Sequence, residues 1–205
     1  GNGTASSKSN SFRVNNNGQI YAKSSSVSTG ADYAEYFEWE DENPNNEDRV
    51  GYFVTLNKDK IRIATSKDDY ILGVISGMPS VIGNGDEEWM GRYIFDEFQR
   101  PIEETIEYEF EEIDKETGEK IKTIKTATKW KENPDYDSTR EYKQRDERPE
   151  WDAVGMLGVL SVYDDGTCKV NGFCKCSDSG IATASESGYR VIKRIKDNIV
   201  KIIFK

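Results

Sequence analysis

The chain consists of short runs of β-branched and aromatic residues, and turn-forming residues separate these runs at short intervals. The clearest runs are YFVTL at 52–56, KIRIA at 60–64, YILGVISG at 70–77 and AVGMLGVLSVY at 153–163. Turn signals fall between or after them, at Asn57-Lys58-Asp59, Asp165-Gly166 and Asn171-Gly172. Such spacing is typical of strands in small antiparallel sheets. We therefore expect a mainly β fold with a small β-barrel or sandwich-like body.

The first 31 residues differ in composition from the rest, because Ser, Asn, Gly, Thr and Ala dominate them. Phe12 and Val14 alternate before an Asn17-Gly18 turn, and Ile20 and Ala22 alternate after it, which indicates a small hairpin. Isolated hairpins are marginal in water. Residues 1–31 are therefore either a linker or the β-rich end of a fibrous structure, and we place a separate domain at 32–205.

The alternating pattern of residues 102–130 predicts a long β-hairpin arm that projects from the body. The first strand alternates apolar and acidic residues, and KIKTIKTATKW returns as a basic strand. A three-residue loop at Glu116-Thr117-Gly118 would pair Phe110 with Ile124, Tyr108 with Thr126 and Glu109 with Lys125. In that register one face carries Ile106, Tyr108, Phe110, Ile124 and Trp130. We expect this face to contact a neighbouring subunit or the segment upstream.

The last third of the chain holds two further hairpin candidates. GTCKVNGFCKC predicts two strands around Asn171-Gly172, with Cys168, Cys174 and Cys176 unbridged and packed as free thiols. The tail GYRVIKRIKDNIVKIIFK fits a hairpin that turns at 197–198, but its apolar residues also fit one helical stripe.

Composition excludes several classes of function. The chain has no histidine, which removes Ser-His-Asp and Cys-His catalysis and His-ligated zinc. Its net charge of −10 argues against nucleic acid as the main partner. No apolar run approaches about 18 residues, so we expect no membrane span. Phosphate-binding loops, HExxH and GxSxG are absent as well, and we expect no metal and no cofactor.

The chemistry that remains is that of carboxylates, and one pair stands out where the Ser-rich segment ends. Asp32 and Glu35 lie among Tyr33, Tyr36 and Phe37. Attack of the Asp32 carboxylate on the carbonyl of Ala31 closes a six-membered ring, and such intramolecular attack gains effective molarity. Glu35 could then protonate the leaving nitrogen or position a water. From the residues alone, two acidic groups rimming an aromatic core remain the alternative.

The run Gly30-Ala31-Asp32-Tyr33-Ala34-Glu35-Tyr36-Phe37-Glu38-Trp39 resembles the opening signature of the G2 peptidase family. These are the C-terminal intramolecular-chaperone, self-cleaving domains of phage tail spikes and neck appendage proteins. The upstream FRV-NNNGQIYA, the stretch GVISGMPSVIGN at 73–84 and the region from Val154 to Gly180 also resemble that family.

The resemblance implies a homotrimeric β domain that follows its own upstream spike and acts in the host cytoplasm while the virion appendage is assembled. It implies cleavage between Ala31 and Asp32, with Asp32 and Glu35 as the catalytic pair. A second hypothesis is a non-cleaving trimeric tip that binds a host surface glycan through exposed aromatic side chains (Trp130, Tyr136, Tyr142 and Trp151).

Overall fold

The computed structural model describes residues 2–4, 7–9, 12–14, 19–22, 28–85, 91–113, 118–141 and 143–205. The chain divides into two compact units, Gly1–Asn84 with Pro149–Lys205, and Gly85–Arg148. Nearly all regular structure in the described residues is strand, and the one exception is a 3-10 turn, η1, at Arg145–Glu147. The mainly β class predicted from the sequence is confirmed. Within the described residues, no helix is long and apolar enough to cross a membrane.

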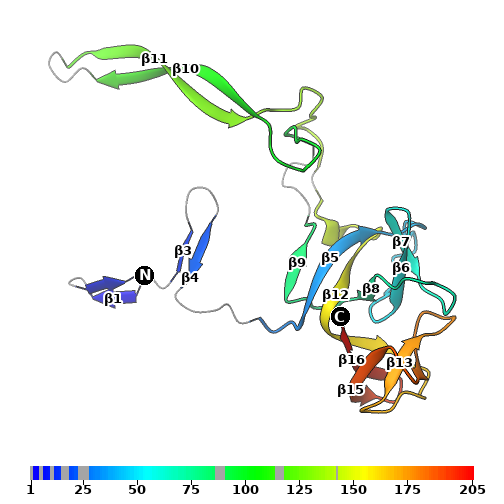
Figure 1. Cartoon of the computed structure of the whole chain (residues 1–205). Helices are drawn as coiled ribbons and strands as arrows, with labels where there is room; N and C mark the ends of the chain where they lie inside the picture. The colour runs from blue at the N-terminus through cyan, green and yellow to red at the C-terminus, as the bar shows by residue number, and fades with distance from the viewer. Residues whose placement is uncertain are drawn as a thin grey trace. The chain divides into compact units, whose positions relative to one another are not determined.

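The first unit is built on one sheet of ten strands. Its main path runs β14-β13-β15-β16-β12-β8-β6-β7, while β5 pairs with β12 and with β9 (Figure 1). The bounds are β5 Asp32–Glu38, β6 Phe53–Asn57, β7 Lys60–Ile63, β8 Gly73–Ile75, β9 Val81–Gly83, β12 Trp151–Tyr163, β13 Phe173–Cys176, β14 Ala182–Ser185, β15 Tyr189–Lys196 and β16 Ile199–Phe204. The long strand β12 joins the two halves, because it pairs with β5 and β8 early and with β16 late.

The sheet curls far enough for strands distant along its path to share one core. Phe53 on β6 packs in the same buried cluster as Val191 and Ile202 from β15 and β16. Its main-chain N–H donates to the Gly180 carbonyl at 2.8 Å, between β13 and β14. A second buried cluster forms around Trp39, Val54 and Ile75. The barrel-like or sandwich-like body expected from the sequence thus takes the form of one curled sheet with two apolar clusters.

Two hairpin predictions in this unit have opposite outcomes. The tail is a hairpin, with Lys196 opposite Ile199 across the expected turn. The hairpin predicted around Asn171-Gly172 is wrong: β13 pairs with β14 and β15, and residues 166–170, directly before the turn, form no strand. Asn171 still has a positive φ of 66°, a backbone conformation that Asn tolerates. Its turn leads into β13, whose partners β14 and β15 both lie later in the chain.

The N-terminal residues form two short antiparallel pairs. The expected hairpin is confirmed in β3 (Phe12–Val14) and β4 (Ile20–Ala22), where Phe12 lies opposite Ala22 and Val14 opposite Ile20. The expected turn at 17–18 lies outside the described residues. A further pair, β1 (Asn2–Thr4) with β2 (Ser7–Ser9), carries no apolar alternation and was not expected.

The second unit contains the predicted arm, as an antiparallel pair of β10 (Glu103–Ile113) and β11 (Lys120–Trp130). The hairpin is confirmed, but its predicted register is wrong by one residue. Phe110 lies opposite Thr123, Tyr108 opposite Lys125, and Glu109 opposite Ile124. Ile113 pairs with Lys120, so the connection is longer than three residues; residues 114–117 lie outside the described part.

A one-residue slip moves side chains to the other face of a strand. Ile106, Tyr108 and Phe110 therefore share a face with Lys125, whereas Ile124 and Trp130 lie on the face of the glutamates. The expected single apolar face is replaced by two mixed faces. The basic strand does face the acidic one, and its ion pairs are Lys122–Glu109 at 2.9 Å, Lys120–Glu111 and Lys125–Glu112 at 3.4 Å, and Lys129–Glu104 at 3.5 Å.

Candidate autoproteolytic site

The Ala31–Asp32 peptide lies at the start of β5, where the chain enters the sheet. β5 runs antiparallel to β12 and parallel to β9, so it is a central strand at this point (Figure 1). Alternation explains the strand, because Asp32 and Ala34 are buried while Tyr33 and Glu35 face the other way. The bond that the resemblance marks for cleavage thus lies where the chain enters the sheet, between the exposed Ala31 and the buried Asp32.

Main-chain hydrogen bonds fix the peptide on both sides. The Ala31 carbonyl oxygen accepts the Val159 N–H from β12 at 3.2 Å. The Asp32 carbonyl oxygen accepts the Ser80 N–H, next to β9, at 2.7 Å. Two carbonyls in sequence are therefore tied to different neighbouring strands, which restricts rotation of the peptide between them.

Glycine permits this close approach on the β12 side. Gly158 has a φ of +125°, a region that L side chains rarely adopt. A Cβ at Gly158 would lie 2.4 Å from the Ala31 carbonyl oxygen and 2.9 Å from the Asp32 Cα. Just before it, β12 contains a bulge between Gly155 and Leu157. Bulges are over-represented next to active sites, where they redirect a strand.

The Asp32 carboxyl is buried, with 6% of the residue exposed, and its Oδ2 has no hydrogen-bond partner within the described residues. Burial raises the pKa of Asp32, while the Ser76 side chain and the main-chain N–H of Asp32 itself oppose that shift in pKa.

A cavity of about 330 Å³ borders the Ala31–Asp32 bond. Ser76, Ser161 and Lys201 contribute to its lining, together with the apolar Ile75 and Leu160. A water molecule takes roughly 30 Å³ in the liquid, so the volume is ample for a hydrolytic water.

Glu35 is not brought to Asp32 within one chain. Three residues along a strand, the two lie roughly 10 Å apart and on opposite faces of β5. The Glu35 Oε1 accepts a hydrogen bond from the Tyr33 hydroxyl at 2.5 Å, and this bond is the main cause of the raised pKa of Tyr33. Sequence spacing alone suggested a pair, but the strand separates its two members.

Two of the cysteines lie on β13, and the third lies in the loop before it. Cys168, Cys174 and Cys176 are buried and free. Burial raises the pKa of Cys174 to about 11 and that of Cys176 to about 12. Cys168 approaches Asp164 and Asp165, but Arg194 donates to both oxygens of Asp164. That carboxylate is therefore already neutralised by a cation of the protein.

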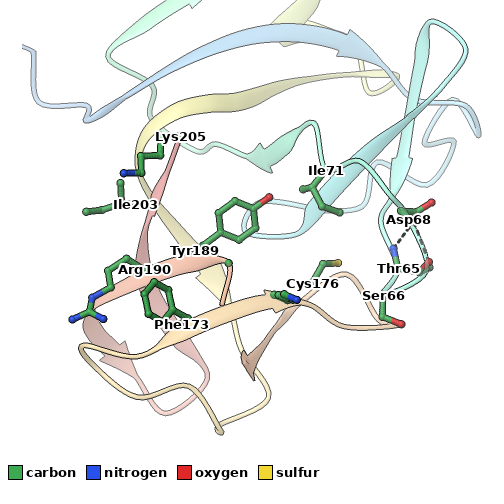
Figure 2. Close-up of a pocket in the computed structure, with 12 residues that line it drawn as sticks. Thr65, Ser66, Asp68, Ile71, Phe173, Cys176, Tyr189, Arg190, Ile203 and Lys205 are labelled. Atoms are coloured by element: carbon green, nitrogen blue, oxygen red, sulfur yellow. Dashed lines mark hydrogen bonds between the residues drawn. The ribbon is translucent and has the colours of Figure 1, made fainter. Parts of the chain in front are cut away.

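A second cavity, of about 660 Å³, lies between the β6–β8 region and the β13–β15 strands (Figure 2). Tyr189 and Ile71 form its apolar side, while Arg190 and Lys205 lie at its edge. Asp68 near its rim is held by Arg62 and Thr65, and the Arg62 hydrogen bond is the main reason its pKa falls to about 2. This cavity is separate from the Ala31–Asp32 peptide.

Comparison with known proteins agrees with the resemblance. Residues 1–200 match the family model Peptidase_G2, described as the IMC autoproteolytic cleavage domain. The chain belongs to the Peptidase_G2 family. It is 37% identical over 191 residues to the pre-neck appendage protein of Bacillus phage B103, covering 92% of this chain and 20% of that protein. The putative phage-related protein YobO of Bacillus subtilis (strain 168) is 36% identical over 184 residues, with 88% and 20% covered.

Solved structures of bacteriophage phi29 gene product 12 are similar as well. The pre-mature protein superposes with a TM-score of 0.69 and 30% identity, covering 92% of this chain and 24% of that one. The C-terminal fragment gives a TM-score of 0.64 and 30% identity, covering 85% of this chain and all of the fragment. The Peptidase_G2 chain thus spans about a fifth of its curated relatives, and its β fold is that of a phage appendage protein.

Sequence reasoning found Asp32 but missed the groups that surround its peptide bond. Val159 and Ser80 act through main-chain N–H groups, which no residue type reveals. Gly158 offered the one available signal, since glycine inside a strand often marks a close approach of backbone.

Proposed function

We propose that this chain is a C-terminal intramolecular chaperone that drives homotrimeric assembly of a phage appendage protein and then cleaves itself between Ala31 and Asp32. The observation that carries the proposal is the buried Asp32 carboxyl, with one oxygen unpartnered, beside a peptide bond fixed between two strands. A buried and unpaired carboxyl is costly for a fold, and such groups concentrate at functional sites.

In the proposed reaction an Asp32 carboxylate oxygen attacks the carbonyl carbon of Ala31. The carbonyl electron pair moves to oxygen, and the tetrahedral centre then expels the Asp32 nitrogen, which takes up a proton. The products of this step are a free Asp32 amine and an anhydride that joins the Ala31 acyl group to the Asp32 carboxyl. Water from the adjoining cavity hydrolyses the anhydride and leaves a carboxylate on Ala31. Burial assists the attack, because a poorly solvated carboxylate is a stronger nucleophile.

Glu35 supplies the proton, or orients the water, from a neighbouring subunit. This assignment follows from the opposite faces of Asp32 and Glu35 on β5, which keep them apart within one chain. A general acid must come within hydrogen-bond reach of its target, so a second copy has to provide it. Cleavage would then require assembly first, and chains that had not assembled would be spared.

The arm takes part in assembly by covering apolar side chains against other copies. Tyr108 and Phe110 are each 40% exposed on one face of the hairpin, and Ile124 is 71% exposed on the other. Full burial of such a side chain gains about 1.5–3 kcal/mol. With apolar groups on both faces, one arm can contact a neighbour on either side, as a closed three-fold assembly requires. Ile106 and Trp130 extend these two contact faces.

Complementation between two inactive variants tests the reaction and its subunit arrangement together. Asp32→Asn and Glu35→Gln should each remain intact when expressed alone, since each lacks one participant. When the two are co-expressed with distinguishable tags, mixed trimers should cleave only the Glu35→Gln chain, which keeps its own Asp32. Cleavage of Glu35→Gln on its own would remove Glu35 from the mechanism. Failure of mixed trimers to cleave would contradict its action across subunits.

A further inference from the structure

The Ala31 carbonyl oxygen already accepts a main-chain hydrogen bond, and that bond is long enough to tighten during cleavage. Val159 N–H reaches the Ala31 oxygen at 3.2 Å, whereas Ser80 N–H reaches the Asp32 oxygen at 2.7 Å and Tyr163 N–H, further along β12, reaches the Gly51 oxygen at 3.0 Å. A long hydrogen bond in the ground state can shorten when charge develops on its acceptor. Only interactions that strengthen in the transition state accelerate the chemical step.

We infer that the main-chain N–H of Val159 stabilises the oxyanion that forms on the Ala31 carbonyl during cleavage, and that Gly158 is the positioning residue that brings this N–H into place. The inference rests on the proposed cleavage between Ala31 and Asp32. In the step concerned, the Asp32 oxygen bonds to the carbonyl carbon, the carbonyl π electrons become a lone pair on oxygen, and Val159 N–H holds that negative charge until the C–N bond breaks.

The surroundings favour a large effect from one donor. Ile75 and Leu160 line the same cavity, and Leu160 is 2% exposed. Charge stabilisation by a fixed donor is worth more beside apolar groups than in bulk water, and removal of one oxyanion donor typically lowers the rate by roughly 10²–10³-fold. The donor belongs to a strand held on both sides by other strands, so it needs no rearrangement at the moment of reaction.

Gly158 fits the positioning role because of what a side chain would do there. Its φ of +125° turns β12 so that the following N–H faces Ala31, and a Cβ would lie 2.4 Å from the oxygen that must become charged. An alanine at this position would push the strand or the carbonyl away while leaving the Val159 N–H chemically intact.

Lys201 brings a positive charge to the lining of the same cavity. It lies opposite Ser161 in the pairing of β16 with β12. A lysine side chain is flexible and acts as a point charge, whereas the strand fixes the Val159 donor in place. The assignment to Val159 therefore requires that loss of the Lys201 ammonium affects the rate less than loss of the N–H.

Replacement of single amides by esters in the full chain tests the inference directly. Cell-free translation with a suppressor tRNA that carries α-hydroxyisovaleric acid converts Val159 to its ester analogue, which replaces the N–H by an oxygen and keeps the side chain. The matched control is the corresponding ester at Tyr163, whose N–H bonds to Gly51 in the same strand. We expect the first-order rate of cleavage to fall roughly 10²-fold at Val159 relative to the Tyr163 control. Equal rates in the two esters overturn the inference, as does a larger loss in Lys201→Met than in the Val159 ester.

A second pair of variants covers the case in which the ester does not fold. Gly158→Ala and Gly166→Ala both place alanine at positive φ, but a Cβ at Gly166 has no atom within 4 Å. Both variants carry backbone strain, and only Gly158→Ala touches the scissile peptide. We expect folded Gly158→Ala to cleave at least tenfold more slowly than Gly166→Ala, and equal rates would overturn the inference.

The failure of this inference and the failure of the proposed function have different signatures. The new N-terminus of the wild-type product is read by mass spectrometry. Cutting at another bond contradicts both the proposed cleavage and its oxyanion donor. Cutting before Asp32 with no penalty in the Val159 ester contradicts the donor alone.

Discussion

Asp32→Asn should abolish cleavage and, at neutral pH, should also stabilise the folded chain. Asp32 is 6% exposed, and its Oδ2 lacks a partner within the described residues. A buried polar group without a partner costs about 1–3 kcal/mol, and a charged one costs more. Asparagine removes the charge but brings an amide that also lacks full hydrogen bonding, so we expect a gain of about 1 kcal/mol, toward the lower end of that range.

The stabilisation by Asp32→Asn should depend on pH, and the pKa of Asp32 decides in which direction. Burial raises the folded-state pKa of Asp32 above its ordinary value of 3.8, so the folded protein holds the proton more tightly than the unfolded chain. The stability that comes from this protonated carboxyl is fully present below pH 3.8 and is lost as pH rises through the folded-state pKa. The advantage of asparagine should therefore be small near pH 4 and should reach its full size by pH 7.

Thermal unfolding between pH 4 and pH 8 measures this effect. The background is Glu35→Gln, so that neither chain cleaves during the experiment, and exposed Asp69→Asn is the control for loss of one negative charge. For a chain of this size, 1 kcal/mol corresponds to a rise in Tm of about 2–4 °C. A gain that is the same at pH 4 and pH 7, or a loss of stability at pH 7, would refute a buried and costly carboxylate at Asp32.

Three other changes test separate parts of the account. Arg194→Met should lower the midpoint of chemical denaturation, because the Asp164 side chain is 0% exposed and loses the cation that pairs with it; an unchanged midpoint would contradict that. The three cysteines should resist thiol reagents at pH 8 until the protein unfolds, because burial raises the pKa of each thiol; rapid labelling of the native protein would argue against it. Deletion of 104–128 with a short Gly-Ser closure should leave the first unit folded but lower the yield of native trimer from the full-length appendage protein, and wild-type yield would rule out a role for the arm.

The sequence predicted pairing well where both strands and their turn are contiguous. The tail hairpin and the β3–β4 pair follow from alternation around a short connection. The arm was found for the same reason, but its register depended on where the turn was placed, and a one-residue error exchanged its faces. The Asn171-Gly172 prediction failed because β13 pairs with β14 and β15, and alternation cannot identify partners outside the local hairpin.

The candidate site shows a similar division between what sequence patterns reveal and what they do not. Asp32 could be predicted, because its carboxyl can close a six-membered ring on the preceding carbonyl and its neighbours match a family signature. The separation of Asp32 from Glu35 could not be predicted until residues 32–38 were known to be a strand, since the same spacing on a helix would place the two side chains together. The donors from Val159 and Ser80 lie 128 and 48 residues from the carbonyls they bind, so only the folded sheet reveals them.

The central claim is that this chain cuts itself before Asp32 without external protease, and a time course of freshly folded protein tests it. Purified chain is sampled by intact-mass spectrometry and by N-terminal sequencing, at several concentrations above that at which the trimer forms. We predict one new fragment, residues 32–205, that begins with Asp32 and appears with a first-order rate independent of protein concentration, while Asp32→Asn stays intact. A chain that remains whole, a fragment that begins at another residue, or cleavage that persists in Asp32→Asn would contradict the account.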